Sequence, residues 1–187
     1  MNEGKNVVSR REFLNSAVLG AAVLAAGPIF KINAKEDPAP SAAKIFVCGV
    51  CGHVEFGGAP ENCPVCHAPK DKFSLNNSLF TDTMTKFKDK EMSHAPVITY
   101  KKESTLVSDL PCKEVGVRVG KTMHPMEEAH HIKFIDWYLN DKFVNRFFTP
   151  LSIYPAVSIY IKAPGSKVRT VSWCNLHGYW QAEAEFS

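Results

Sequence analysis

The second half of the chain alternates apolar and polar residues in short runs rich in Val, Ile, Tyr, Phe and Thr. Residues 115–119, Val-Gly-Val-Arg-Val, are typical: a period of two places every second side chain on one face of a strand. Turn-forming pairs, Asn140-Asp141 and Pro164-Gly165, separate some of these runs. The pattern predicts an all-β fold, an immunoglobulin-like sandwich of seven short strands. We place them at residues 96–102, 114–119, 131–139, 142–148, 156–161, 168–173 and 181–186.

Residues 74–92 are polar and irregular, apart from a short helical stretch predicted near residues 79–87. We interpret them as a connection between two domains, which fits a length of 187 residues. The chain then divides into five parts. These are a signal peptide at 1–34, a linker at 35–43, a small module at 44–73, the connection at 74–92 and a larger domain at 93–187.

The N-terminal segment has the pattern of an export signal. Arg10-Arg11 precedes Phe13-Leu14 and an apolar run at 17–30, which is shorter than the roughly 20 residues of a spanning helix. The paired arginines resemble a twin-arginine signal, which implies export of a folded protein to the periplasm. Cleavage is expected near Lys35; an uncleaved membrane anchor or a buried helix is the alternative. The net charge of +3, without a basic block, argues against nucleic acid as a partner.

Four of the six cysteines form two C-x-x-C pairs, Cys48 with Cys51 and Cys63 with Cys66. Each pair closes a tight knuckle that aims two thiolates at one point, so two knuckles supply a tetrahedral site for zinc or iron. A zinc ribbon without a redox role and a set of disulfides are the alternatives. Four thiolates fill such a site, so we expect His53 and His67 to be surface or loop residues.

This module resembles the rubredoxin-like module of rubrerythrins, from Val47 through the motif C-P-V-C-H-A-P-K at 63–70 to Phe73. The resemblance implies that iron is bound by the four cysteines. One departure is His67, which stands where a glycine commonly follows the second knuckle.

A second group of metal-binding residue types is scattered over the larger domain. Five of the seven histidines and one cysteine lie in three pieces of it, His94-Ala95-Pro96, the segment H-P-M-E-E-A-H-H at 124–131, and C-N-L-H-G at 174–178. Cys174 and His177 are spaced i, i+3, which a tight loop can direct at one metal.

These motifs, over about residues 88–187, resemble the catalytic domain of superoxide reductases, the desulfoferrodoxin and neelaredoxin family. The resemblance implies a non-haem iron with the ligands His94, His124, His130, Cys174 and His177. His131 is not expected to be a ligand, because neighbouring strand residues point to opposite faces. Glu127 and Glu128 are either acceptors that orient the ligand histidines or solvated side chains. Cys112 belongs to neither motif, and we expect it to be an inert, partly buried thiol.

The family often carries Glu-Lys immediately before its first histidine, where the glutamate can occupy the open iron position and the lysine attracts superoxide. Here those positions are Met92 and Ser93, with Glu91, Lys90 and Lys88 just upstream. Either these neighbours take over the roles or the enzyme works without them.

The resemblance implies an enzyme that reduces superoxide to hydrogen peroxide and receives electrons through the four-cysteine iron. Its expected partners are superoxide, an electron donor of the rubredoxin or cytochrome type, and further copies of the chain in a homo-oligomer. The alternative is a non-catalytic iron-binding electron carrier or a redox sensor with a zinc-ribbon module.

Overall fold

A computed structural model describes residues 44–101, 106–107, 111–162 and 166–186. The predicted signal peptide and linker, and the predicted turn at Pro164-Gly165, lie outside the described residues. Within the described ranges, every helix is too short or too polar to cross a membrane.

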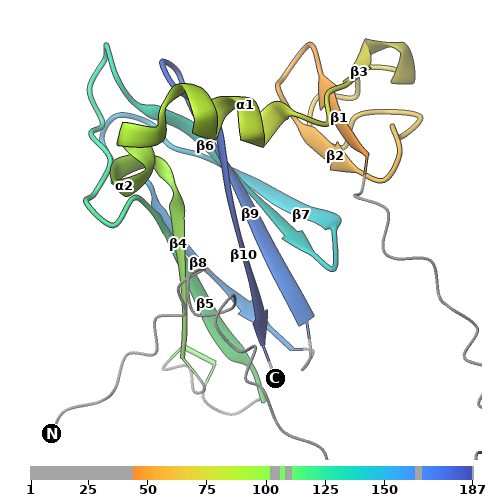
Figure 1. Ribbon diagram of the computed structural model, residues 1–187. Helices are drawn as coiled ribbons and strands as arrows, with labels where there is room; N and C mark the ends of the chain where they lie inside the picture. The colour runs from red at the N-terminus through yellow and green to blue at the C-terminus, as the bar shows by residue number, and fades with distance from the viewer. Residues whose placement is uncertain (1–43, 102–105, 108–110, 163–165, 187) are drawn as a thin grey trace, which may run out of the picture.

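The larger domain is a β-sandwich of two antiparallel sheets (Figure 1). One sheet has the order β4-β5-β8, formed by β4 (Pro96–Lys101), β5 (Lys113–Val119) and β8 (Ala156–Ile161). The other has the order β10-β9-β6-β7, formed by β6 (Ile132–Leu139), β7 (Lys142–Phe148), β9 (Ser166–Cys174) and β10 (Gly178–Phe186). The seven predicted strands are confirmed, and β9 and β10 extend further than predicted, until Cys174 pairs with Gly178.

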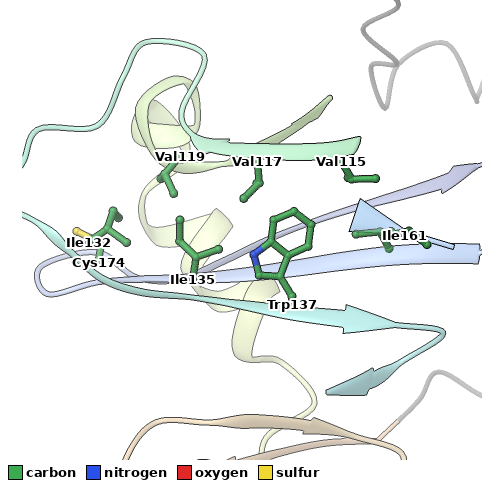
Figure 2. Packing of buried hydrophobic residues seen from close by; sticks show 9 residues of the cluster. Val115, Val117, Val119, Ile132, Ile135, Trp137, Ile161 and Cys174 are labelled. Atoms are coloured by element: carbon green, nitrogen blue, oxygen red, sulfur yellow. The ribbon is translucent and has the colours of Figure 1, made fainter. Parts of the chain in front are cut away.

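The space between the two sheets holds the main core, where alternate residues of each strand point inward (Figure 2). Val115, Val117 and Val119 of β5 face Ile135 and Trp137 of β6, and all five side chains are buried. Fully burying a side chain of this size contributes about 1.5–3 kcal/mol. At one end of this core lies Cys174, beside Ile132.

The turn between β6 and β7 is formed by Asn140 and Asp141, with φ values of 51° and 63°. Two successive positive φ values match the twist of a two-residue hairpin, which Asn and Asp tolerate. The turn predicted at this pair is therefore confirmed.

The small module is a three-stranded sheet of order β2-β1-β3, formed by β1 (Ile45–Cys48), β2 (Val54–Phe56) and β3 (Phe73–Leu75). Its third strand extends two residues past the expected boundary at 73, and a short 3-10 turn, η2 (Lys70–Lys72), precedes it. The connection then forms α1 (Leu79–Lys86), the 3-10 turn η3 (Lys88–Lys90) and α2 (Glu91–His94). The predicted helix is thus confirmed as α1.

A second apolar cluster joins the module to the outer face of the four-stranded sheet. Val54 and Phe56 of the module and Phe80 of α1 pack with Tyr138 and Val171, and all five are buried. The Tyr138 hydroxyl also donates a 2.6 Å hydrogen bond to the carbonyl of Val54. The module is too small for a core of its own and shares one with the sandwich.

His53 lies in the loop before β2, but the expectation of a surface position is wrong, because its side chain is fully buried in this joint. Its ring packs edge-on against Phe143, with centroids 4.6 Å apart. Its Nε2 lies 3.0 Å from Glu55 and its Nδ1 lies 3.5 Å from Asp136. Burial lowers the pKa of His53, but the hydrogen bond to Glu55 and the nearby charge of Asp136 outweigh it, so the pKa is raised. His53 is buried because the strand after the first knuckle lies against the sheet.

Candidate metal centres

The four module cysteines converge on one point, and their sulfurs all lie within 4.8 Å of one another. The Sγ atoms of Cys48 and Cys66 are 3.7 Å apart, and those of Cys51 and Cys63 are 3.6 Å apart. A tetrahedron with metal–sulfur bonds of about 2.3 Å has edges of about 3.8 Å. These separations are longer than the S–S bond of about 2.05 Å in a disulfide, and the described residues contain no disulfide, which argues against the disulfide alternative. The four sulfurs therefore fit a tetrahedral metal ion.

Burial raises the pKa of both Cys51 and Cys63. Thiols in this setting resist ionisation by themselves, whereas a bound cation deprotonates its thiol ligands outright. Bringing four thiols this close together is favourable when a metal lies between them.

His67 follows the second knuckle with a φ of 61°, in the left-handed region that favours glycine. Its side chain is exposed, as expected. Histidine is one of the residue types that adopts this conformation more readily than most, so the departure leaves the knuckle intact.

The second centre forms at one end of the sandwich, from three segments of the chain. His94 is the last residue of α2, His124 follows β5, His130 precedes β6, and Cys174 ends β9. His177 lies in the turn between β9 and β10. The structure thus brings together all five residues expected to bind the second metal.

The distances between the donor atoms are short. The Nε2 of His94 lies 3.1 Å from Nε2 of His124, 3.3 Å from Nε2 of His130 and 2.8 Å from Nδ1 of His177. The sulfur of Cys174 lies 3.6 Å from the same Nδ1. The ligand atoms of His94, His130, Cys174 and His177 all lie within 4.8 Å of one another, and His124 joins this group through His94.

Backbone carbonyls orient two of the imidazoles. The Nδ1 of His94 lies 3.0 Å from the carbonyl oxygen of Lys90, and that of His124 lies 2.6 Å from the carbonyl of Pro125. A carbonyl can only accept, so each Nδ1 carries the proton and each Nε2 keeps its lone pair. Facing lone pairs repel unless a cation lies between them, so these rings fit a metal ion.

Burial lowers the pKa of His94 and of His124 to about 4. It also lowers the pKa of His130 and His177. Neutral imidazole is the form that binds a metal, so all four rings are in the required state at neutral pH. Burial raises the pKa of Cys174, and its ionisation would be driven by the metal.

Two further residues hold the loops of this centre, and neither was expected from the sequence. The side chain of Asn175 accepts a 2.9 Å hydrogen bond from the backbone of His131 and donates a 3.0 Å bond to the carbonyl of Ala129. Gly120 has a φ of 85°, and a Cβ there would lie 2.5 Å from the carbonyl oxygen of Ser93. Asn175 therefore joins the two histidine-bearing loops, and Gly120 permits the close approach of α2. In the sequence, the signal that could have identified Asn175 is its position between the ligands Cys174 and His177.

The positive charge of Lys90 acts on two histidines of this centre. Its charge adds to burial in lowering the pKa of His130 and His177. The ammonium pairs with Asp89 at 2.8 Å, and both side chains are largely exposed. Lys88 and Glu91 are exposed. The sequence could not separate Lys90 from Lys88.

The remaining residues singled out from the sequence lie outside the two sets of metal ligands. His131 precedes β6 instead of starting it, and its Nδ1 lies 3.0 Å from the carbonyl of Glu127. The side chains of Glu127 and Glu128 are exposed, which favours the solvated interpretation. The Cys112 thiol is half-buried and donates to the carbonyl of Val107 at 3.6 Å.

Comparison with known proteins finds the same two parts. The desulfoferrodoxin family model matches residues 84–183, and the rubredoxin-like domain of rubrerythrin matches residues 46–74. A desulfoferrodoxin from Desulfarculus baarsii is 30% identical over 151 residues, which cover 77% of this chain and 98% of that protein.

A superoxide reductase from Pyrococcus abyssi is 34% identical over 119 residues, covering 57% of this chain and 98% of that protein. The solved superoxide reductase (neelaredoxin) from Ignicoccus hospitalis shares 29% identity with a TM-score of 0.43, covering 51% of this chain and 80% of that one. Because the family model spans more than half of the chain and a relative matches along nearly its whole length, this chain belongs to the desulfoferrodoxin family.

Proposed function

We propose that this protein is a superoxide reductase, which converts superoxide to hydrogen peroxide with one electron and two protons. The observation that carries the proposal is the convergence of four imidazole nitrogens and the Cys174 thiol at one end of the sandwich. Iron bound by these residues would supply the electron and would bind a small anion. The four cysteines would hold a second iron, which would supply the replacement electron; zinc at that site is the alternative.

The protein's own groups set the charge of the reactive centre. Four neutral imidazoles and one thiolate leave a ferrous ion with a net charge of about +1. A positive site attracts superoxide, and Lys90 adds positive charge on the same side. The thiolate of Cys174 donates electron density, which favours transfer of an electron to the substrate.

The test measures how much hydrogen peroxide forms for each superoxide that is consumed. A reductase yields one hydrogen peroxide for each superoxide consumed and leaves the centre oxidised by one electron. A dismutase yields one for every two. The prereduced protein exposed to a known dose of superoxide is expected to give the first ratio, and Cys174→Ser is expected to give none above background. The second ratio, or no consumption by the intact protein, would reject the proposal.

We also infer export by the twin-arginine route, from Arg10-Arg11 and the apolar run behind them. The periplasm is the expected location, with the signal cleaved or retained as an anchor. Changing both arginines to lysine is expected to keep the protein in the cytoplasm. Continued export of that variant would reject this route.

The expected electron donor is a small one-electron carrier of the rubredoxin or cytochrome type. We further infer a homo-oligomer, because large apolar side chains are exposed on the edge strand β7 and after it, among them Val144, Phe148 and Tyr154. Light scattering of the purified protein tests this, and a monomer at micromolar concentration would contradict it.

A further inference from the structure

The first knuckle of the module rests on an aromatic side chain of the sandwich. The hydroxyl of Tyr179, on β10, donates a 3.0 Å hydrogen bond to the carbonyl oxygen of Gly52, the residue after Cys51. Gly52 has a φ of 72°, and a Cβ there would lie 2.6 Å from that hydroxyl. This close approach therefore requires glycine at position 52.

A second contact reaches the same knuckle from β7. Arg146 donates a 2.8 Å hydrogen bond from Nη1 to the carbonyl oxygen of Cys51. Its guanidinium carbon lies 3.4 Å from the centre of the Phe134 ring. Asp136 holds the guanidinium in place with hydrogen bonds of 2.6 and 2.7 Å.

The two contacts converge on Trp173. The Tyr179 ring stacks on it with centroids 6.0 Å apart, and the Phe134 ring lies 5.6 Å away on centroids. Trp173 is peptide-bonded to Cys174, which belongs to the second centre. Because side chains alternate along a strand, Trp173 faces the module while Cys174 faces the core. Trp173 therefore links the outer face of the sheet to the second centre through the backbone.

We propose that Trp173 and Tyr179 form the bridge along which an electron crosses from the four-cysteine centre to the Cys174 centre within one chain. In this step the iron held by the four cysteines is oxidised from ferrous to ferric, and the iron held by Cys174 and the histidines is reduced from ferric to ferrous. One electron moves, no proton is needed, and both rings keep their electron count. An external one-electron carrier then restores the first iron. This inference rests on the proposed presence of two irons and adds the residues that connect them.

Attachment of the module to the sandwich does not by itself require the contacts that Tyr179 and Arg146 make with the first knuckle. The apolar cluster around Val54 and Tyr138 already attaches the module to the sheet. The contacts at the knuckle instead reach the backbone at the first ligand pair, and both lead to the residue next to a ligand of the other centre. The connection between the two donor sets therefore consists of the Gly52–Tyr179 hydrogen bond, the stack of the Tyr179 ring on Trp173, and the peptide bond from Trp173 to Cys174.

The experiment delivers one electron without using superoxide. A pulse of reduced viologen radical, present at less than one equivalent, is given to the fully oxidised holoprotein, and the absorption of both centres is followed. The four-cysteine band is expected to bleach first and then recover as the second band bleaches. The recovery is expected to be first-order and independent of protein concentration.

Variants separate a bridge from a structural support. Trp173→Leu is expected to slow the recovery by at least about tenfold, while Trp173→Phe, which keeps a ring, retains much of the rate. Tyr179→Phe removes only the hydroxyl and is expected to slow it less than Trp173→Leu does. Tyr160→Leu changes an exposed ring of the other sheet, outside this connection, and is expected to leave the rate unchanged. Iron content, both spectra and both midpoint potentials are expected to stay as in the wild type.

Three results would overturn the inference. One is an unchanged recovery rate in Trp173→Leu; another is a rate that rises with protein concentration, which would place the transfer between molecules. The third is the absence of a recovery phase in the wild type while both irons are present. Because no superoxide is used, these outcomes are distinct from failure of the reductase activity itself.

Discussion

Replacing Arg146 by Met removes the charged residue at the joint between the module and the sandwich. Its side chain is 3% exposed, that of its partner Asp136 is 0% exposed, and the pair is bidentate. The same guanidinium also bonds the carbonyl of Cys51. Met fills a similar volume, so the change removes the hydrogen bonds and the charge with little loss of packing.

The expected destabilisation is about 3–5 kcal/mol, the range for removing one partner of a buried ion pair. The lower end is favoured, because His53 lies 3.5 Å from Asp136 and its pKa is raised. A protonated His53 can therefore compensate part of the charge on Asp136 that loses its partner. Adding Asp136→Asn removes the unpaired carboxylate, so the double variant is expected to be more stable than the sum of the two single changes predicts.

Urea unfolding of the holoprotein, followed by circular dichroism, measures these free energies. Arg118→Met is the matched control, since Arg118 is an exposed arginine on β5, and its change is expected to stay within about 0.5 kcal/mol. A cost for Arg146→Met no larger than that of the control would refute the claim that this ion pair fastens the module to the sheet.

Three further predictions concern the second centre. Lys90→Met is expected to slow the reaction with superoxide and to flatten its salt dependence, whereas Lys88→Met changes little; equal effects in pulse radiolysis would contradict this assignment. Glu91→Ala is expected to leave the absorption of the oxidised centre unchanged, because Glu91 is exposed; a shifted band would identify its carboxylate as a ligand. Since burial lowers the pKa of His94 and His124 to about 4, the NMR signals of these two rings in the metal-free protein are expected to remain those of neutral imidazole until the pH falls toward that value; titration near the ordinary histidine pKa would show that the rings are not held neutral.

The strands and the four-cysteine ligand set could be predicted from the sequence because their signals are local. A period of two along β5 identifies a strand, and the spacing of Cys48 and Cys51 identifies a knuckle. The five residues of the second centre came from a family resemblance, since Cys174 lies 80 positions after His94 and no spacing connects them.

The joint between the two domains could not be predicted, because it depends on contacts between distant segments. From the sequence, His53 is expected to be a loop residue beside a filled metal site. Its burial follows from strands that begin some 80 residues later. Likewise, Asn175 and Lys90 acquire their roles only when the loops around them meet. Side chains that bridge domains carry no periodic signal of their own.

Metal analysis of the purified protein tests the central claim most directly. Two donor sets, one of four thiols and one of four imidazoles with a thiol, predict two irons for each chain. Cys63→Ser is expected to lose the four-cysteine iron and its absorption while keeping the other iron and its reaction with superoxide. One zinc with one iron in the wild type, or a full complement of iron in Cys63→Ser, would contradict the account.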